Sequence, residues 1–313
     1  MRNKDNGKGK IIVICGPTGI GKTGFAVKLA RQFNGQIISA DSMQIYRQLD
    51  IGTAKPTKEE QALALHHMID IIEPDMDYDA NKFSKEGRSK IDQLLEKKIL
   101  SFVVGGTGFY IKALLQGLFK PVKANLEVRA QLKRELENNG ANALHDRLKK
   151  CDPKAALALH PNDTYRVARA LEIYLVSGQP ITKMQKLHGF DENYYQALKI
   201  GLQMDRELLY KRINQRVDQM IKHGFLDEVK TLLQKGYKRD LKSMQSIGYR
   251  HLIAFIDKRL SWEEAVTTLK RDTRRYAKRQ LTWFKADKEI IWLSPNETTK
   301  AGEMINQFTA SNT

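Results

Sequence analysis

Residues 16–23 contain glycines, a lysine and a threonine at the spacing of a phosphate-binding loop. The pattern G-x-x-x-x-G-K-[ST] is matched in full by Gly16-Pro17-Thr18-Gly19-Ile20-Gly21-Lys22-Thr23. Glycines let backbone N–H groups turn toward an anion, and a helix beginning there adds the positive end of its dipole. Lys22 supplies a charge for phosphate oxygens, and the Thr23 hydroxyl suits Mg²⁺, a hard cation. We therefore predict that these residues bind phosphate groups together with Mg²⁺.

The flanks of this loop fit the structural context that the motif requires. Residues 11–15 are apolar and predict a buried strand, and Phe25, Leu29 and Phe33 recur afterwards at helical spacing. A glycine-rich turn without a ligand is the simpler alternative, but a strand before the loop and a helix after it favour a phosphate site.

Two more predicted strand ends carry side chains that could act beside the loop. The strand predicted over 36–42 ends on Asp41, and the strand over 99–104 is followed by Gly105-Gly106-Thr107-Gly108. Ligands of open α/β sheets bind beyond the carboxyl ends of strands, so Asp41 should lie near the loop, unless it merely caps the next turn. ATP hydrolases usually have an Mg²⁺-binding Asp where Thr107 and the glycines stand. Thr107 is therefore a candidate for phosphate or Mg²⁺ contact.

Composition indicates a soluble globular protein of the cytoplasm. The chain has 313 residues, of which 41% are hydrophobic and 28% charged. No apolar stretch approaches the ~18 residues of a membrane span, and no signal peptide is recognisable. Cys15 and Cys151 lack metal-ligand spacing and do not suggest a disulfide. The adjacent pair His66-His67 would diverge on a helix and is a poor metal site.

The net charge of +17 indicates a polyanionic partner. Most of the basic surplus lies in residues 121–313. A basic C-terminal part joined to a phosphate loop favours nucleic acid as the partner, whereas the alternative is a lysine-rich solvated surface.

Periodicity predicts an α/β fold: a P-loop NTPase-like parallel sheet flanked by helices, with an inserted all-helical subdomain. Residues 1–120 and 196–313 are expected to form the P-loop catalytic domain with C-terminal basic helices, and residues 121–195 the inserted helical subdomain. The remaining strands are predicted at 68–72, 197–204 and 290–293, and further helices at 81–97, 205–222, 225–234 and 246–257. Residues 43–56 are expected to form a loop, and the polar tail after Pro295 to fray.

The helix that starts at Ser261 is the best patterned. Ser261 and Glu264 form a capping box, and one helix side is apolar. The opposite side collects Lys270, Arg271, Arg274, Arg275, Lys278 and Arg279. Such a face fits contact with nucleic acid phosphates, and a solubilising face is the alternative.

Three functions fit these observations. A P-loop kinase would bind ATP in the loop and activate a small hydroxyl substrate with Asp41. A P-loop transferase would hold the diphosphate of its donor and release it as leaving group. A non-catalytic RNA-binding protein would carry a vestigial loop. The lack of a strand-end Asp, the helical insertion and the basic helix favour a transferase with a large anionic acceptor.

Seven segments form an ordered set that is typical of one enzyme family. They are Gly16 to Thr23, Asp41-Ser42-Met43-Gln44-Ile45-Tyr46, Asp50-Ile51-Gly52-Thr53-Ala54-Lys55-Pro56, Val104-Gly105-Gly106-Thr107-Gly108, Arg166 through Glu172, Ile247-Gly248-Tyr249-Arg250 and Lys278-Arg279-Gln280. In this order they resemble bacterial tRNA dimethylallyltransferases, over about residues 10–285. The family usually has Gln-Arg where this chain has Tyr165-Arg166, and the zinc finger of eukaryotic members is absent.

The resemblance implies a reaction and a set of site residues. A dimethylallyl group would pass from dimethylallyl diphosphate to the exocyclic N6 amine of the adenosine 3′-adjacent to the anticodon of tRNA, giving i6A and diphosphate. Asp41 would be the general base, Thr107 would help bind the leaving group and fix the acceptor, and residues 16–23 would bind diphosphate and Mg²⁺. Arg212 or Arg216, one helical turn apart, would also reach the diphosphate.

The tRNA partner would be bound through its anticodon stem-loop by a monomer. The insertion over 121–195 would clamp that stem. The residues expected to line tRNA are Asp41, Ser42, Met43, Gln44, Thr107, Arg129, Tyr165, Arg166, Val167, Ala168, Arg169, Ser243, Gln245, Gly248, Tyr249, Arg250, Arg275 and Arg279.

Overall fold

The computed structural model describes residues 9–118, 125–188 and 192–311. The described chain forms two compact units. The first comprises Met1–Leu115 and Tyr194–Thr313, and the second Gln116–Asn193. The first residues of the predicted insertion, from Pro121, lie outside the described ranges. Within those ranges, no helix combines the length and apolar character needed to cross a bilayer.

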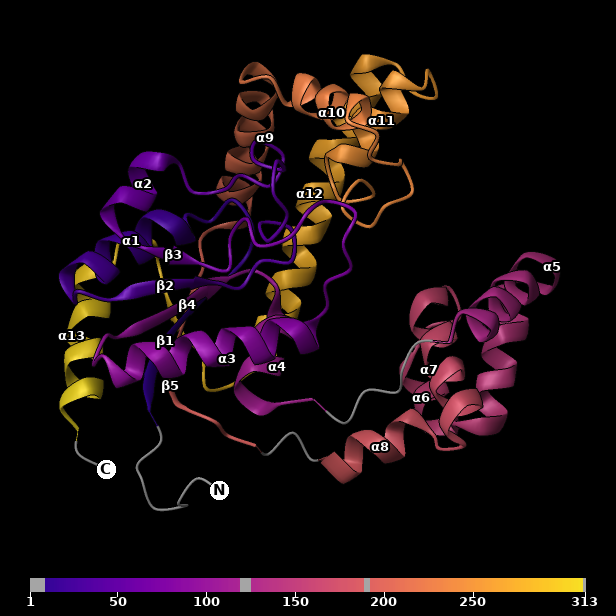
Figure 1. The fold of residues 1–313 in the computed structure, drawn as a ribbon, viewed down its shortest axis with the longest axis horizontal. Coiled ribbons are helices and arrows are strands. Elements are labelled where there is room, and N and C mark those ends of the chain that lie inside the picture. The colour runs from indigo at the N-terminus through magenta and orange to yellow at the C-terminus, as the bar shows by residue number, and fades with distance from the viewer. Residues whose placement is uncertain (1–8, 119–124, 189–191, 312–313) are drawn as a thin grey trace. The chain divides into compact units, whose positions relative to one another are not determined.

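The first unit is built on one six-stranded parallel sheet, which confirms the predicted α/β fold class (Figure 1). Its strand order is β3-β2-β4-β1-β5-β6. The strands are β1 (Lys10–Cys15), β2 (Gln36–Ser39), β3 (His66–His67), β4 (Ser101–Gly105), β5 (Gln196–Leu202) and β6 (Ile291–Leu293). The order reverses direction at β1, and such a reversal creates a crevice at the carboxyl ends of the strands. The phosphate loop follows β1 at that point.

The central strands are continuous apolar runs because helices cover both faces of the sheet. Alternate residues of β1 point to opposite faces, and Ile12 and Ile14 share one buried cluster with Leu29 of α1 and Ile305 of α13. In Figure 1, α1 and α13 lie on one face of the sheet and α3 lies on the other. This packing holds the loop between β1 and α1 on a rigid base.

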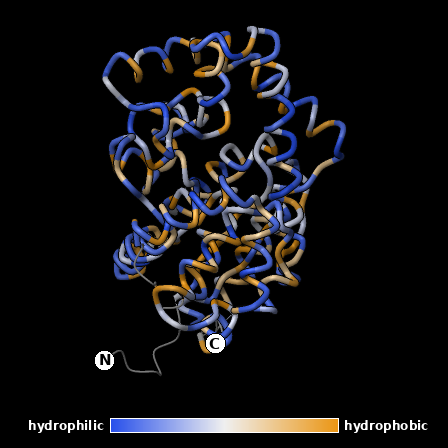
Figure 2. Tube along the Cα trace, turned by 90° about the vertical axis from the view of Figure 1, so that its right-hand side faces the viewer, coloured by the Kyte–Doolittle hydropathy of each residue, from blue (hydrophilic) through white to orange (hydrophobic). Residues whose placement is uncertain are grey.

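The predicted helices of this unit are present, and the three longest begin at side-chain caps. Asp79, Asp205 and Ser261 accept first-turn N–H groups of α3, α9 and α12. Figure 2 shows hydrophobic and hydrophilic residues alternating along the coiled parts of the chain, as in helices that cover a core. The helices are α1 (Lys22–Gln32), α2 (Lys58–Leu63), α3 (Ala80–Glu96), α4 (Gly108–Gln116), α9 (Arg206–Lys222), α10 (Phe225–Gln234), α11 (Tyr249–Ile256), α12 (Trp262–Lys285) and α13 (Thr298–Ala310).

Two predictions for this unit are wrong. The strand expected over 68–72 is instead the two-residue β3 (His66–His67), and Ile72 makes an isolated parallel bridge with Tyr46. The tail after Pro295 does not fray, because it forms α13, whose residues Ala301 and Ile305 are fully buried. Burial of one apolar stripe stabilises α13, although its sequence is mostly polar.

The second unit contains α5 (Leu126–Cys151), α6 (Pro153–Ala158), α7 (Thr164–Ser177) and α8 (Ile181–His188). Leu132, Leu148 and Val167 belong to its own hydrophobic cluster. The span of α5 contains a kink at Gly140, whose φ of 79° and ψ of 174° are not helical. Positive φ favours glycine, and Gly140 separates two consecutive helices within this span.

Candidate active site

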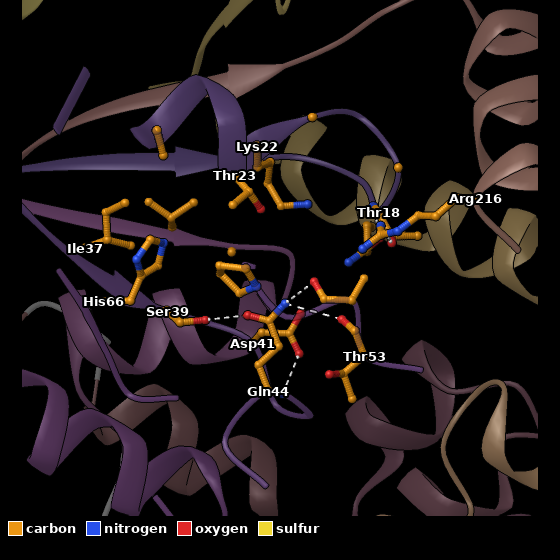
Figure 3. A pocket seen from close by; sticks show the side chains of 18 of the residues that line it. Thr18, Lys22, Thr23, Ile37, Ser39, Asp41, Gln44, Thr53, His66 and Arg216 are labelled. Atoms are coloured by element: carbon orange, nitrogen blue, oxygen red, sulfur yellow. Dashed lines mark hydrogen bonds between the residues drawn. The ribbon is translucent and has the colours of Figure 1, made fainter. Parts of the chain in front are cut away.

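A cavity of about 230 Å³ lies at the carboxyl ends of β1, β2 and β4. It is lined by residues from the phosphate loop, the segment after β2, the end of β4, α9 and α12. Figure 3 places Lys22 and Thr23 across the cavity from Asp41 and Gln44, with Arg216 and Thr18 at a further side. The lining residues are Thr18, Gly19, Gly21, Lys22, Thr23, Ala26, Ile37, Ser39, Asp41, Gln44, Thr53, Ala54, Pro56, His66, Val104, Gly105, Arg212, Arg216, Tyr276 and Gln280.

The phosphate loop has the backbone of an anion cradle. Gly16, Gly19 and Gly21 all have positive φ, so the loop turns in a way that side chains would oppose. Gly21 caps α1 without any side-chain hydrogen bond, and the first turn of α1 carries no acidic residue. The N–H groups of that turn are therefore available to an anion at the positive end of the helix dipole.

Lys22 is folded back over this loop. Its Nζ donates hydrogen bonds to the carbonyl oxygens of Gly16 at 3.0 Å and Pro17 at 2.9 Å. Burial lowers the pKa of Lys22 to about 8, although nearby Asp41 acts in the opposite direction and Arg216 adds to the lowering. A partly desolvated ammonium beside a second cation is a site that favours a multiply charged anion.

Both candidate arginines of α9 line the cavity. Arg216 donates from Nη1 to the Thr18 hydroxyl at 3.1 Å. The side chain of Arg212 approaches Gly21 closely enough that a Cβ on that glycine would lie 3.3 Å from Nη2. Burial lowers the pKa of Arg216, which nearby Asp41 counteracts. Both arginines therefore flank the phosphate loop, and the geometry does not separate the two candidates.

Asp41 lies on the opposite wall in a defined orientation. Its Oδ1 accepts the N–H groups of Met43 at 2.9 Å and Gln44 at 3.4 Å. Asp41 therefore also forms the turn cap that sequence analysis offered as the alternative. Because Oδ1 takes these backbone bonds, the other carboxylate oxygen is available to the cavity that Asp41 lines.

Thr107 joins this wall to the end of β4. Its Oγ1 accepts the N–H of Ser42 at 3.1 Å, and its own N–H donates to the Ala40 carbonyl at 3.2 Å. The structure thus brings together Thr107 and the Asp41-Ser42 pair, which are far apart in sequence. Thr107 itself does not line the cavity of 230 Å³, whereas its neighbour Gly105 does.

A third wall comes from the segment after β2. The Gln44 amide donates from Nε2 to the carbonyls of Thr53 at 3.3 Å and Ala54 at 3.2 Å, and its Oε1 accepts the Ser39 hydroxyl at 3.0 Å. These bonds hold the loop over 43–56 against the cavity. Gln44 therefore shapes the site from within, and its amide is committed to protein partners.

His66 lines the same cavity, whereas sequence analysis described it only as part of a poor metal site. Its Nδ1 lies 2.7 Å from the Ala64 carbonyl, so Nδ1 carries the proton and Nε2 is the acceptor. Burial lowers the pKa of this imidazole. Together with Ala26, Ile37 and Val104, the neutral ring gives one side of the cavity an apolar character.

Two residues of α12 were missed as cavity residues. Gln280, only 7% exposed, accepts the Thr18 N–H at 2.8 Å and donates to the Gly106 carbonyl at 2.8 Å. Tyr276, one turn earlier, also lines the cavity. Burial, followed by the charge of Asp41, raises its pKa to about 12. The position of both residues on the buried side of α12 was a signal available in the sequence. A contact between residues 262 positions apart, such as Thr18 and Gln280, was not.

The predicted tRNA residues of the first unit divide into buried and exposed groups. Ser243, Gly248 and Tyr249 are buried and offer no side chain to the surface. Ser243 instead bonds the Pro74 carbonyl, and Tyr249 bonds Glu228. Ser42 and Met43 are half-buried, whereas Gln245, Arg250, Arg275 and Arg279 are exposed.

The basic face of α12 is smaller than predicted. Lys270 pairs with Asp218 at 2.5 Å, and Arg274 donates to Asn214 at 2.6 Å, so both are used to dock α9. Arg271 and Arg250 both pair with Asp272, at 3.1 Å and 2.8 Å. The exposed positions that continue this face toward the end of α12 are Arg275, Lys278 and Arg279.

The predicted tRNA residues of the second unit centre on one buried carboxylate. Glu172 accepts Arg129 at 2.8 Å, Arg169 at 2.6 Å and the Asn125 N–H at 3.0 Å. Burial opposes the charge of Glu172, but hydrogen bonds from Arg169 and Arg129 outweigh it and lower its pKa.

The other predicted tRNA residues of this unit differ in exposure. Arg166 pairs with Asp163, and Tyr165 is 81% exposed. Val167 is fully buried and Ala168 packs against the core of the unit, so neither presents a side chain freely to RNA.

Among the residues that the structure describes, no three His, Cys, Asp or Glu side chains converge as a metal site. The Thr23 hydroxyl lies beside Lys22 on the cavity. This donor set fits a hard cation held mainly by ligand oxygens and water, as is usual for Mg²⁺.

Comparison with known proteins identifies the family of this chain. The family model described as IPP transferase matches residues 44–287, and the isopentenyl transferase model matches residues 9–68. A tRNA dimethylallyltransferase of Desulfatibacillum aliphaticivorans is 52% identical over 96% of this chain and 98% of its own. One from Desulfosudis oleivorans is 50% identical over 92% of both chains.

Solved structures agree with these relatives. The full-length tRNA isopentenylpyrophosphate transferase from Bacillus halodurans has a TM-score of 0.72 and 41% identity, with 96% of each chain covered. A eukaryotic dimethylallyltransferase captured acting on tRNA has a TM-score of 0.79 and 28% identity over 96% of this chain and 80% of its own. Family models, sequence relatives and fold therefore agree, and the chain belongs to the tRNA dimethylallyltransferase family.

Proposed function

We propose that this enzyme transfers the dimethylallyl group of dimethylallyl diphosphate to the N6 amine of the adenosine 3′-adjacent to the anticodon of tRNA. The observation that carries the proposal is the arrangement of one cavity, with the phosphate loop and Lys22 on one side and Asp41 on the other. Family membership supports a prenyl transfer to tRNA, and the cavity supports the residue roles.

The loop side of the cavity is suited to a departing diphosphate. The first residues of α1, the Lys22 side chain and Arg216 all line this cavity. When the C1–O bond of the donor breaks, the electron pair leaves with the diphosphate, and these fixed donors stabilise the new negative charge without reorganising. Arg212 adds a second guanidinium at Gly21.

The Asp41 side is suited to the incoming amine. An aryl amine is a weak nucleophile, and positive charge develops on N6 as its lone pair forms the bond to C1 of the donor. Asp41 accepts the N6 proton, so the products are the N6-substituted adenosine and diphosphate. Thr107 fixes Asp41-Ser42 from the end of β4 through its bond to the Ser42 N–H.

Mg²⁺ is proposed as the metal that accompanies the diphosphate, with Thr23 as its protein ligand. When bound, Mg²⁺ neutralises charge on diphosphate oxygens. The apolar side of the cavity, formed by Ala26, Ile37, Val104 and the neutral His66, offers a dry environment for a five-carbon chain.

The tRNA is proposed to reach the site as an extruded base. A stacked adenosine cannot reach a carboxylate inside a cavity, so the base must leave the anticodon loop. The exposed Arg275 and Arg279 of α12 are available to phosphates, and the second unit, with the exposed Tyr165 on α7, is proposed to bind the anticodon stem. We further propose that the enzyme acts as a monomer in the cytoplasm, where its tRNA substrate is found.

One incubation tests the proposal. The protein is mixed with Mg²⁺, dimethylallyl diphosphate labelled in the prenyl group, and unmodified tRNA, and the tRNA nucleosides are analysed by mass. We expect one adenosine per tRNA to gain a dimethylallyl group, with an equal amount of diphosphate released. Unlabelled tRNA together with ATP-dependent phosphorylation of a small molecule would contradict the proposal and favour a kinase.

A further inference from the structure

The side chain of Gln280 lies between two loops that the proposed reaction assigns to different substrates. Its Oε1 accepts the N–H of Thr18 in the phosphate loop at 2.8 Å. Its Nε2 donates to the carbonyl of Gly106, directly before Thr107, at 2.8 Å. One amide therefore bonds the diphosphate loop and the loop that fixes the acceptor side.

Each end of this bridge leads to reacting groups. On the donor side, Thr18 is also held by Arg216 through its hydroxyl at 3.1 Å. On the acceptor side, Thr107 follows Gly106 and holds the Ser42 N–H at 3.1 Å, next to Asp41. A displacement at Gln280 would thus change the spacing between the leaving group and the base.

The bridge is close-fitting, and both ends of the amide are hydrogen-bonded. A Cβ on Gly106 would lie 2.2 Å from Nε2, so a side chain there would displace the amide. Gln280 is 7% exposed, and its oxygen and its nitrogen each have a backbone partner. Removing a buried partner leaves backbone groups unpaired, which costs about 1–3 kcal/mol per group.

We infer that Gln280 is a positioning residue that sets the distance and angle between the diphosphate loop and the Asp41 wall. The inference rests on the proposed function, and it gives α12 a role within the site in addition to its exposed basic face. Because Gln280 bonds the backbone of both loops, its inferred effect is transmitted through Thr18 and Gly106.

The main test is the kinetics of Gln280→Met, which keeps the side-chain length but removes both hydrogen bonds. Misplacement of reacting groups by about 1 Å can cost about 100-fold in rate. We expect kcat to fall about 10- to 100-fold, with KM for the prenyl donor and for tRNA each within about threefold of wild type. Thr282→Ala, on an exposed part of α12, is the matched control and should leave all three constants unchanged.

A second variant separates hydrogen bonding from packing and serves if Gln280→Met folds poorly. In Gln280→Glu, the ionised side chain still accepts from Thr18 but faces the Gly106 carbonyl without a donor, whereas the protonated form restores that donor. We expect the ratio of variant to wild-type kcat to rise several-fold as pH falls from 8 to 6. The charged and titratable groups on the same cavity are Lys22, Asp41, His66, Arg212, Arg216 and Tyr276. They are present in both proteins, so the ratio isolates position 280.

A failure of the inference about Gln280 can be told apart from a failure of the proposed function. If wild-type protein transfers no prenyl group, the proposed function fails first. If wild type is active and kcat of Gln280→Met stays within twofold of it, the inference about Gln280 is wrong. A variant-to-wild-type ratio for Gln280→Glu that is constant with pH would likewise overturn it, because packing alone would then explain the loss.

Discussion

Arg216 Nη1 donates to Thr18 Oγ1 at 3.1 Å, across 198 residues of sequence. This bond joins α9 to the phosphate loop, which thereby depends on a helix outside the motif. In many proteins such a loop is held by its own strand and helix alone. Here α9 places a guanidinium against the loop where a diphosphate is proposed to bind.

Replacing Arg216 with alanine should weaken donor binding and slow transfer. A charge-assisted hydrogen bond contributes about 1.5–3 kcal/mol, so kcat/KM for the prenyl donor should fall at least tenfold. Steady-state kinetics at fixed tRNA measures the change. Gln215→Ala, exposed on the same helix, should behave as wild type. Equal effects of the two substitutions would contradict a role for Arg216 at the diphosphate.

Loss of the Lys22 charge should lower kcat/KM for the prenyl donor at high pH. Burial lowers the pKa of Lys22 to about 8, so the ammonium is lost as pH rises through that value and diphosphate binding should weaken. We expect kcat/KM for the donor to decline above pH 8 in wild type. In Lys22→Arg, which keeps its charge, the residual activity should not show this decline. A wild-type profile that is flat from pH 7 to 9.5 would contradict the assignment.

Asp41→Asn should remove proton acceptance while keeping the local fold. The amide oxygen can still accept the Met43 N–H at the Oδ1 position, so the turn should survive. A general base contributes about 10²- to 10⁴-fold. We expect kcat to fall by that order, while tRNA affinity from filter binding stays within threefold. Asp227→Asn, at an exposed carboxylate, is the control, and substantial turnover by Asp41→Asn would exclude its role as base.

Glu172→Gln should destabilise the second unit without affecting the cavity of the first. Loss of charge weakens the bonds from Arg129 and Arg169, and we expect about 1.5–3 kcal/mol lower protection of α5 and α7 amides in hydrogen exchange of the full chain. The pKa of Glu172 is lowered on folding. Its stabilisation is therefore present above the ordinary carboxyl pKa and is lost as pH falls through the lowered one. Glu137→Gln, in an exposed ion pair with Lys133, should change protection by less than about 0.5 kcal/mol.

Arg275→Ala combined with Arg279→Ala should reduce the salt dependence of tRNA binding. Each phosphate contact contributes about 0.7–0.9 to the slope of log K against log salt. The double variant should lose about 1.4–1.8 from that slope, measured between 50 and 300 mM KCl. Lys300→Ala on α13 is the control. An unchanged slope would show that this part of α12 does not contact tRNA phosphates.

Much of the site could be predicted because local patterns specify it. The phosphate loop, the strand ending near Asp41 and the glycines before Thr107 each combine a periodic element with special residues. The rule that ligands bind at carboxyl ends of strands then brings these segments to one edge of the sheet. The capping residue Asp205 likewise indicated where the arginine-bearing helix begins.

Other features depend on contacts that the sequence does not display. The strand β3 has two residues, too few for any periodicity, so the neighbouring 68–72 run was chosen instead. The helix α13 has a polar sequence and is stabilised by packing against the sheet. Sequence analysis assigned Gln280 no role of its own within the Lys278-Arg279-Gln280 segment, because its two partners are backbone atoms in loops far away in sequence.

The close packing after β4 also restricts what this scaffold can become. A Cβ at Gly105 would lie 2.1 Å from the Ala40 carbonyl oxygen, and one at Gly106 would meet the Gln280 amide. Nucleotide hydrolases of related architecture carry an acidic side chain near this strand terminus, yet neither position here has space for one. An ancestral or engineered route to ATP hydrolysis would therefore require the whole strand end to be rebuilt, and point mutation to aspartate would cost folding before it gained a metal ligand.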